Sequence, residues 1–466
     1  MVVDTTVRDG RIVTPGGIVR GGLAIAGEQI VAIGSEGALP ESRRTIDACG
    51  RYVIPGLLDA HVHLGPGGLD WPTTAADFRS ESRAAAYGGV TTALVFLFSL
   101  DSYLPALNDL IGWGEANSVI DFAFHAGINS PAQIAEIPGL VARGITSFKH
   151  FFTVYRHEGG GTIEAMDAGM LYRSFRAIAA VGNGAIAQVH AEDMDLILLH
   201  QAEVQASGRR DLEAWSLARP PLCEALAIEQ VALIAREAAA RPYIVHLSSA
   251  AGVEAVEREQ CSGLDLVAET CPQYLTLDQT MEAQVGCWGK VNAPVRTAAD
   301  QERLWQALRD GSVTTMGTDH APLDRAGKEK GGQQFDDVWT AGPGIPSGLE
   351  HLLPLLLSAG VSAGRLDIEQ LVRVASENTA KVFGLCPRKG VLQPGADADL
   401  VIVDPAYEGE IGRDFYHGVA RDWSPYFGYP LRGLPVLTMV RGTVVMAERE
   451  LVDDRPRGRY LPRPAN

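Results

Sequence analysis

Two histidines separated by one valine are the most chemically suggestive residues of this sequence. The stretch Asp59-Ala60-His61-Val62-His63 follows an apolar run and a Pro55-Gly56 turn, which is typical of a β-strand. Residues i and i+2 of a strand face the same side, so both imidazoles can reach one divalent ion of the zinc class. Taken alone, the pair is equally compatible with two ordinary polar residues at a strand edge.

Ligand-type side chains also close four other apolar stretches. A lone residue of this kind is more often structural, but five separate strand ends that all carry one favour a metal site. Carboxylate and neutral imidazole groups are ligands that zinc accepts, whereas a lysine needs a separate explanation. The four further residues are Lys149, His190, His246 and Asp319.

The elements that position these residues alternate between short apolar strands and helical segments. This alternation predicts a parallel sheet covered by helices, and eight such units over residues 55–387 predict an α/β fold, a TIM (β/α)8 barrel. Catalytic residues of such barrels lie where the strands end, which is where the five positions fall. The expected strands begin near Leu57, Thr91, Asp121, Ile145, Ala185, Pro242, Leu266 and Val313.

Both ends of the chain have a different sequence pattern: short runs of β-branched residues are separated by residues typical of turns. Neither end alone has enough strands for a stable core. Residues 1–54 and 388–450 are therefore expected to form one small β-sandwich together, and residues 451–466 form a C-terminal tail. That tail could contribute to an interface or be disordered.

The composition of the chain argues against several classes of partner and location. The 466 residues carry a formal net charge of -17 with no compensating basic cluster, which excludes nucleic acid and anionic membrane surfaces as partners. The sequence offers no signal-peptide pattern and no apolar run of membrane-spanning length. The six cysteines form no CxxC pair, so we expect buried free thiols and a cytoplasmic location.

The set of ligand-type residues, in this order, resembles the amidohydrolase superfamily over essentially the whole chain. Further stretches resemble its cyclic amidase branch, the hydantoinase and dihydropyrimidinase family. They are Pro55 to His63, Gly88 to Thr92, Glu269 to Tyr274, Ser376 to Lys381 and Gly395 to Asp399. The resemblance implies a metal-dependent hydrolase that acts on carbon–nitrogen bonds in cyclic amides, and commonly a homotetramer.

The resemblance also implies the metal ligands. His61, His63 and Asp319 would hold one divalent ion, and His190 and His246 the second. Lys149 would bridge the two ions as N6-carboxylysine, because an ammonium has no lone pair whereas a carbamate offers two anionic oxygens. Zinc is the expected metal, and manganese or cobalt would suit the same ligands.

The implied reaction is the ring-opening of a hydantoin or dihydropyrimidine to an N-carbamoyl amino acid. Two metals that share a water make hydroxide available at neutral pH, and that bridging hydroxide attacks the ring carbonyl. Asp319 would carry the proton from the hydroxide to the departing nitrogen. The substrate is expected to be a small neutral ring.

Three residues are candidates for contact with the ring. Tyr155 stands one residue beyond the family's spacing from the lysine, where Val154 occurs, so an oxyanion role and an ordinary loop tyrosine both stay open. The family's substrate loops correspond to residues 290–296 and 342–350, which contain Asn292 and Gly344. Asn292 could contact the ring imide or cap a turn before a proline. Asp59 and His320 belong to matching motifs and could orient ligands.

Other functions remain open at this point. Dihydroorotases and many allantoinases carry an arginine shortly after the HxH pair, and here none follows His63 until Arg79. Allantoinase, which converts allantoin to allantoate, is therefore the alternative, and dihydroorotase is less favoured. Non-catalytic, hydantoinase-like scaffold relatives lack metal ligands that this chain retains. One-metal deaminases do not use a bridging lysine, so Lys149 argues against them.

Overall fold

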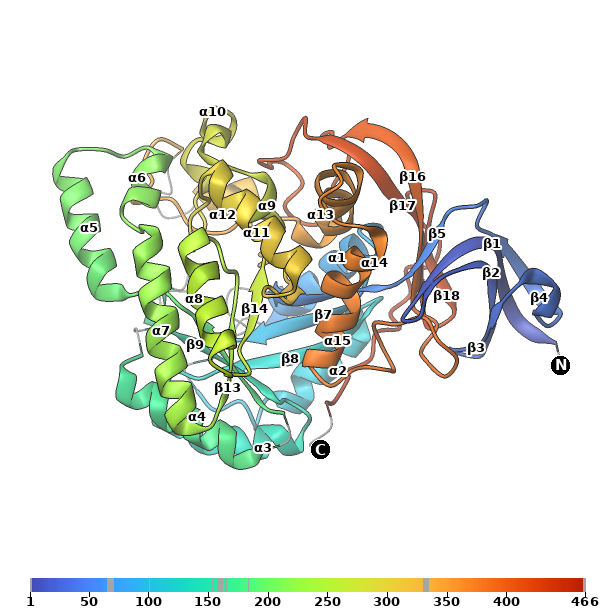
Figure 1. Cartoon of the computed structure of the whole chain (residues 1–466), viewed down its shortest axis with the longest axis horizontal. Helices are drawn as coiled ribbons and strands as arrows, with labels where there is room; N and C mark the ends of the chain where they lie inside the picture. Colours follow the sequence, from blue (N-terminus) through green and yellow to red (C-terminus); the bar gives the residue numbers. More distant parts are fainter. Residues whose placement is uncertain are drawn as a thin grey trace.

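The computed structural model describes residues 2–64, 71–99, 101–152, 155–156, 162–163, 166–182, 184–329 and 335–463. Its larger part is an eight-stranded parallel sheet that curls into a barrel (Figure 1). The strands follow one another in chain order: β6 (Leu57–His63), β7 (Val90–Leu97), β8 (Asp121–Gly127), β9 (Ser147–Phe151), β12 (Ile186–His190), β13 (Arg241–Ile244), β14 (Val267–Thr270) and β15 (Thr315–Met316). The predicted (β/α)8 barrel is confirmed, and each strand begins within two residues of its expected start.

The barrel closes between its first strand and the segment after its last. Val62 of β6 forms a parallel bridge with His320, and the His63 amide donates to the His320 carbonyl at 2.8 Å. These main-chain contacts tie the strand that carries the two histidines to the segment that carries Asp319. The closure itself therefore brings the two parts of the predicted metal site together.

Helices cover the outside of the barrel (Figure 1). Strands β7 and β8 are buried along their whole length, as apolar parallel strands are when helices cover them. None of the described helices combines the length and apolar character needed to cross a membrane. The helices are α1 (Trp71–Tyr87), α2 (Leu107–Asn117), α3 (Pro131–Ala142), α4 (Ala168–Val181), α5 (Met194–Ala206), α6 (Leu212–Leu217), α7 (Pro221–Ala238), α8 (Ala250–Cys261), α9 (Pro272–Thr276), α10 (Glu282–Val285), α11 (Ala298–Asp310), α12 (Arg325–Glu329), α13 (Gly348–Leu355), α14 (Ile368–Val372) and α15 (Asn378–Val382).

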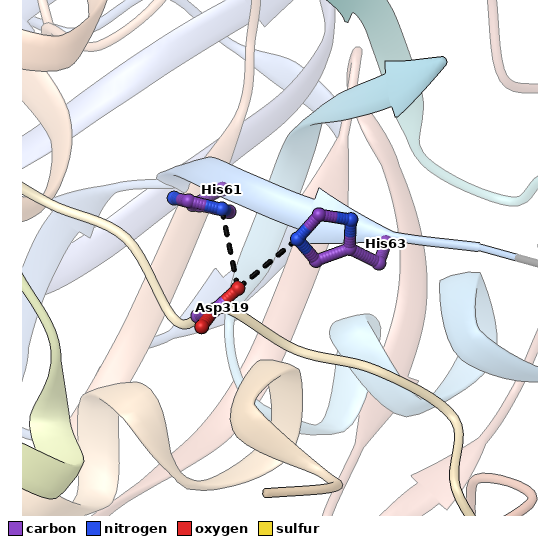
Figure 2. A group of neighbouring side chains, drawn as sticks. All are labelled: His61, His63 and Asp319. Carbon is purple, nitrogen blue, oxygen red and sulfur yellow. Dashed lines mark hydrogen bonds and ion pairs between the residues drawn. The ribbon is translucent and has the colours of Figure 1, made fainter. Parts of the chain in front are cut away.

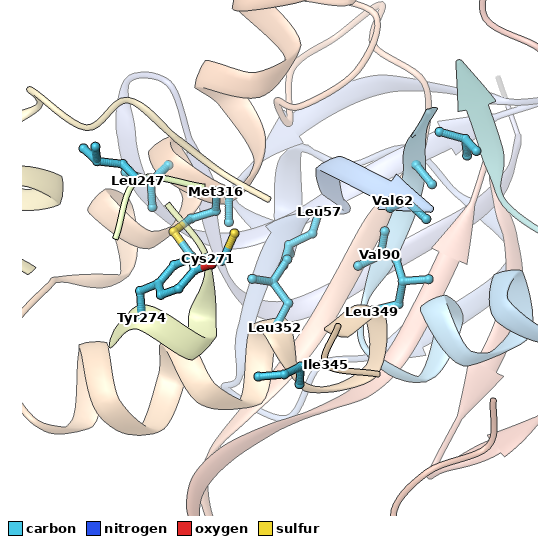
Figure 3. Close-up of a cluster of buried hydrophobic side chains, with 14 of the residues drawn as sticks. Leu57, Val62, Val90, Leu247, Cys271, Tyr274, Met316, Ile345, Leu349 and Leu352 are labelled. Carbon is cyan, nitrogen blue, oxygen red and sulfur yellow. The ribbon is translucent and has the colours of Figure 1, made fainter. Parts of the chain in front are cut away.

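An apolar core between strands and helices holds β6 in place. Leu57 and Val62 of β6 and Val90 of β7 lie in one cluster with Leu349 and Leu352 of α13, and each is at most 1% exposed (Figure 3). Burial of such side chains stabilises the fold by about 1.5–3 kcal/mol each. The strand that carries the two histidines is therefore packed on a rigid surface.

Strands from both chain ends form a second, nine-stranded mixed sheet, seen beside the barrel in Figure 1. The central strand β5 (Tyr52–Pro55) pairs in parallel with β1 (Val3–Thr14) and antiparallel with β16 (Leu400–Glu410). The sheet encloses its own apolar core, and the Ile30 amide of β3 donates to the Ala396 carbonyl of the segment before β16 at 3.0 Å. The other strands are β2 (Gly17–Ala26), β3 (Gln29–Gly34), β4 (Ser42–Asp47), β17 (Pro430–Val440), β18 (Thr443–Ala447) and β19 (Glu450–Leu451), and β10 (Tyr155–Arg156) and β11 (Thr162–Ile163) form a separate hairpin.

The described part of the C-terminal tail packs against the barrel. The Phe122 amide donates to the Arg459 carbonyl at 3.0 Å, and the Leu461 amide donates to the Phe122 carbonyl at 2.8 Å. Arg463 is 1% exposed and donates to the Ser147 hydroxyl at 2.6 Å. The tail therefore covers the end of the barrel where strands β8 and β9 begin.

The cysteines are free, as predicted, but not all of them are buried. All six are free thiols. Cys223, Cys271 and Cys287 are buried, but Cys49 and Cys261 are exposed. The expectation that the thiols are buried is therefore wrong for these two. Cys49 lies in a turn and Cys261 is the last residue of α8, and the local sequence does not reveal that either is exposed.

Candidate metal centre

Three predicted ligands meet at the carboxyl ends of the strands. His61 and His63 project from β6, and Asp319 lies three residues after β15 (Figure 2). The Nε2 atoms of His61 and His63 lie 3.2 Å and 3.0 Å from Oδ1 of Asp319. Within the described residues this is the one group of three or more such side chains whose ligand atoms all lie within 4.8 Å of one another.

The lone pairs of this group suit a cation. His61 donates from Nδ1 to Glu269 at 2.8 Å, so its Nε2 carries the lone pair. That Nε2 atom is buried and makes no aligned hydrogen bond. A carboxylate oxygen and an imidazole lone pair that face each other repel unless a positive charge lies between them. Two imidazole nitrogens and a carboxylate oxygen are ligands that zinc accepts, so the residues fit a divalent ion.

Burial and neighbouring charges keep most of the predicted ligands in the ionisation state that metal binding needs. Burial lowers the pKa of His63 to about 4 and also lowers the pKa of His190 and His246, with the charge of Lys149 as a further cause. Burial alone would raise the pKa of Asp319, but its contacts with His61 and His63 hold that pKa well below the usual value. His63, His190 and His246 are therefore neutral and Asp319 is ionised at pH 7. His61 differs: burial and the charge of Lys149 act to lower its pKa, but the carboxylates of Glu269 and Asp319 outweigh them and raise it.

Lys149 lies in the middle of β9 and points into the same buried region. Its side chain is 1% exposed, and Nζ lies 4.9 Å and 5.4 Å from the ring centres of Phe96 and Phe151. Burial lowers its pKa to about 8, although the charges of Asp319 and Glu269 act in the opposite direction. About a tenth of this amine is therefore neutral at pH 7, and only the neutral amine can react with carbon dioxide.

His190 and His246 form a pair beside the first group. Their ring centres are 4.4 Å apart, and His246 lies 5.5 Å from His61 by the same measure. His190 is the last residue of β12, and its Nε2 donates to Glu192 at 2.7 Å, which leaves Nδ1 as the lone-pair nitrogen. His246 follows β13 by two residues and has a left-handed backbone with φ of 41°. His63, His190, His246 and Asp319 thus lie at or just after the carboxyl ends of their strands. His61 and Lys149 lie two residues before the ends of β6 and β9, so the expectation that Lys149 ends its strand is wrong.

Three buried polar residues support the ligands. Asp59 accepts from the amides of His61 and Thr318, each at 3.0 Å, and so links the two ligand-bearing segments. His320 contributes the carbonyl that closes the barrel. Both had been expected as orienting groups, whereas no role was expected for Glu269. The only signal for Glu269 was its place at the end of the seventh strand, in the stretch Glu269 to Tyr274.

The two predicted substrate loops contact each other. The Gly344 amide donates to the Lys290 carbonyl at 3.0 Å, and Lys290 Nζ donates to the Val338 carbonyl at 2.9 Å. Gly344 has φ of 127°, a conformation that favours glycine. The Oδ1 atom of Asn292 is buried without a hydrogen-bond partner in the described residues. Tyr155 begins the short strand β10, and its side chain lies outside the described part of the chain.

The chain is similar to known proteins over nearly its whole length. A model of the amidohydrolase family matches residues 52–445. The L-hydantoinase of Paenarthrobacter aurescens is 35% identical and the alignment covers 99% of this chain and 98% of that protein. The D-hydantoinase of Geobacillus stearothermophilus is 36% identical, with coverage of 98% and 96%. The solved structure of dihydropyrimidinase from Brevibacillus agri superposes with a TM-score of 0.90 at 30% identity and covers 99% of each chain.

These matches confirm the family resemblance from which the ligand set was predicted. The family model spans the whole barrel, and the relatives align over nearly their full length. The chain belongs to the amidohydrolase family, as a hydantoinase- and dihydropyrimidinase-like hydrolase.

Proposed function

We propose that this protein hydrolyses a cyclic amide bond and opens a hydantoin or dihydropyrimidine ring to an N-carbamoyl amino acid. The buried group of His61, His63 and Asp319 carries the proposal. It lies in a chain that aligns over nearly its whole length with an L-hydantoinase and a D-hydantoinase. The absence of an arginine between His63 and Arg79 favours a neutral ring over an anionic one.

The donor atoms suit two divalent ions. His61, His63 and Asp319 would hold one ion, His190 and His246 the other, and a carboxylated Lys149 would bridge them. Bound there, the ions, zinc by donor preference with manganese or cobalt also compatible, would activate a water and polarise the ring carbonyl. A buried lysine with a pKa of about 8 supports the carboxylation, since it supplies the neutral amine that carbon dioxide requires.

The side chains of the protein then handle the proton and the ring. Asp319, ionised and buried, accepts the proton of the attacking water and delivers it to the ring nitrogen as the amide bond breaks. The unpartnered Oδ1 of Asn292 accepts a hydrogen bond from a ring N–H. Gly344 contributes its carbonyl to the same ring contact, since its amide donates to Lys290, and the Tyr155 hydroxyl donates to the carbonyl oxygen as negative charge develops on it.

The proposal is tested with protein reconstituted with zinc and bicarbonate. It is assayed for ring opening of hydantoin, 5-substituted hydantoins, dihydrouracil, allantoin and dihydroorotate, with Lys149→Ala as the negative control. Turnover of hydantoins or dihydrouracil that the control lacks would support the proposal. Preference for allantoin would favour an allantoinase, and no turnover of any ring by protein with two bound metals would reject the substrate class.

We also infer that the enzyme works in the cytoplasm as a homotetramer. Six free thiols support a reducing compartment, because exposed cysteines such as Cys49 and Cys261 oxidise readily elsewhere. The tetramer rests on resemblance alone. Light scattering coupled to size-exclusion chromatography measures the assembly, and a mass of one chain would reject it.

A further inference from the structure

Glu269 is a buried carboxylate that contacts both groups of predicted metal ligands. It lies on β14, which carries none of the predicted ligands, and is fully buried. Its Oε1 accepts from His61 Nδ1 at 2.8 Å and from the His246 amide at 3.1 Å. Its Oε2 accepts from the Tyr243 hydroxyl at 2.7 Å.

We infer that Glu269 is the positioning residue that couples the two predicted metal sites. It does so by orienting the side chain of His61 in one site and the backbone of His246 in the other. This inference rests on the ligand roles given under the proposed function. It goes beyond them because a single carboxylate, itself no ligand, would then set the geometry of both sites at once.

The effect on His61 is to select one tautomer. A carboxylate that accepts from Nδ1 keeps the proton on that nitrogen and leaves the lone pair on Nε2. Nε2 is the atom that lies 3.2 Å from Oδ1 of Asp319 and makes no aligned hydrogen bond. Without Glu269, the Nδ1–H would have no acceptor, and the ring could turn or exchange its proton.

The effect on His246 is on the backbone. Its φ of 41° lies in the left-handed region, which a residue with a side chain adopts only when its surroundings hold it there. The His246 amide donates to Glu269, and the Leu247 amide donates to the Glu269 carbonyl at 2.7 Å. Glu269 therefore receives two successive amides from the turn that aims the His246 ring toward His190.

Tight packing restricts the side chain of Glu269. A Cβ atom on Gly317 would lie 2.6 Å from Cβ of His61 and 2.7 Å from Cδ of Glu269, so the pair fits only because residue 317 has no side chain. On the other side, the Tyr243 hydroxyl that binds Oε2 lies 2.8 Å from the Thr315 hydroxyl. Because the Tyr243 proton goes to Glu269, Thr315 donates to Tyr243. The carboxylate is thus held by Tyr243 of β13 and His61 of β6, and Thr315 of β15 holds the Tyr243 hydroxyl in turn.

The test is a titration of metal-free protein with Co²⁺ in the presence of a competing chelator, followed by visible absorption. The parent should bind two equivalents per chain. Glu269→Gln, which keeps the shape of the side chain, should weaken both equivalents by about 10–100-fold, the usual effect of changing a group that orients a ligand. Glu192→Gln is the comparison variant, because Glu192 contacts His190 alone among the predicted ligands and should weaken one equivalent only.

Asp399→Asn is the matched control. Asp399 is a buried carboxylate that receives Lys389 and the Arg441 amide at the opposite end of β6, so this variant should bind cobalt like the parent. Thermal unfolding of each metal-free variant separates loss of fold from loss of metal. If Glu269→Gln fails to fold, Tyr243→Phe tests the same point by releasing Oε2 only, with a smaller weakening of both equivalents.

The inference would be overturned if folded Glu269→Gln bound both cobalt equivalents as tightly as the parent. It would also be overturned if only one of the two equivalents were weakened. The result is independent of turnover. A parent that binds two cobalt ions but opens no ring would reject the proposed function and leave this inference standing. A parent that opens rings, together with a Glu269→Gln variant of unchanged affinity, would reject the inference alone.

Discussion

Gly317 has no room for a side chain beside the predicted metal site. An added methyl group would approach His61 and Glu269 to less than 3 Å, so one of them must move. Gly317→Ala should therefore lower cobalt affinity by about 10–100-fold and destabilise the fold by about 1–3 kcal/mol. Chelator competition and thermal unfolding measure the two effects.

The matched control for Gly317→Ala is Gly112→Ala. Gly112 is exposed in helix α2, and a Cβ atom there would meet nothing within 4 Å. The same substitution should stabilise the protein by about 0.5–1 kcal/mol, because alanine loses less backbone freedom in a helix. Unchanged cobalt affinity in Gly317→Ala would contradict the tight packing on which the prediction rests.

Lys149 offers a chemical test of the proposed bridging carboxylate. Removing its side chain should lower ring-opening activity by about 10²–10³-fold, the scale of losing one preorganised charged group. The space left in this buried site can admit a small carboxylate, so acetate or propionate should restore part of the activity of Lys149→Ala. Lys381→Ala removes an exposed lysine and should change nothing. Activity of Lys149→Ala equal to the parent, without added carboxylate, would exclude the bridge.

At the scale of elements, the sequence predicts strands better than the contacts between them. Each barrel strand begins within two residues of expectation because apolar runs and turn residues are local signals. The role of Glu269 could not be predicted, since its partner His61 lies 208 residues away. The second sheet was expected from both chain ends, but its closure through the Ile30 amide and the Ala396 carbonyl depends on a loop that has no strand pattern.

The two predicted substrate loops are joined to each other and to the neighbouring chain through Lys290. Its carbonyl accepts from Gly344, and its Nζ donates to Val338 while it lies 4.0 Å from the ring centre of Trp215. Lys290→Met leaves the Val338 carbonyl without this donor and loosens the loops. We expect KM to rise about tenfold, equivalent to about 1.4 kcal/mol, with a smaller change in kcat because ring binding is lost rather than chemistry.

Steady-state kinetics on the ring that turns over best measures this split, with Lys381→Met as the control. Lys381 is exposed and pairs with Glu377, and neither residue belongs to the two loops. A fall in kcat at constant KM would show that Lys290 acts on the chemical step, contrary to the prediction.

At the scale of the whole molecule, one buried lysine joins the barrel, the second sheet and the tail. Lys389 Nζ lies 2.6 Å from Asp121 at the start of β8 and 2.5 Å from Asp399 before β16. Asp121 also accepts from the Arg459 amide of the tail at 2.9 Å and contacts Arg441. Because every partner is buried, loss of the lysine leaves uncompensated carboxylates in a low dielectric.

Lys389→Met should therefore destabilise the protein by about 3–5 kcal/mol, whereas the exposed Lys381→Met should cost at most about 1 kcal/mol. Burial alone would lower the pKa of Lys389, but the charges of Asp399, Asp121 and Asp397 raise it above its usual value. A group whose pKa is raised on folding contributes stability that is present below its unfolded pKa and is lost as pH rises through its folded pKa. The difference between parent and Lys389→Met should thus stay constant from neutral pH to about pH 10 and shrink only at higher pH, as followed by denaturant unfolding. A difference that already disappears between pH 7 and 9 would mean that the lysine is not held by its carboxylates, and that another contact joins the three parts of the chain.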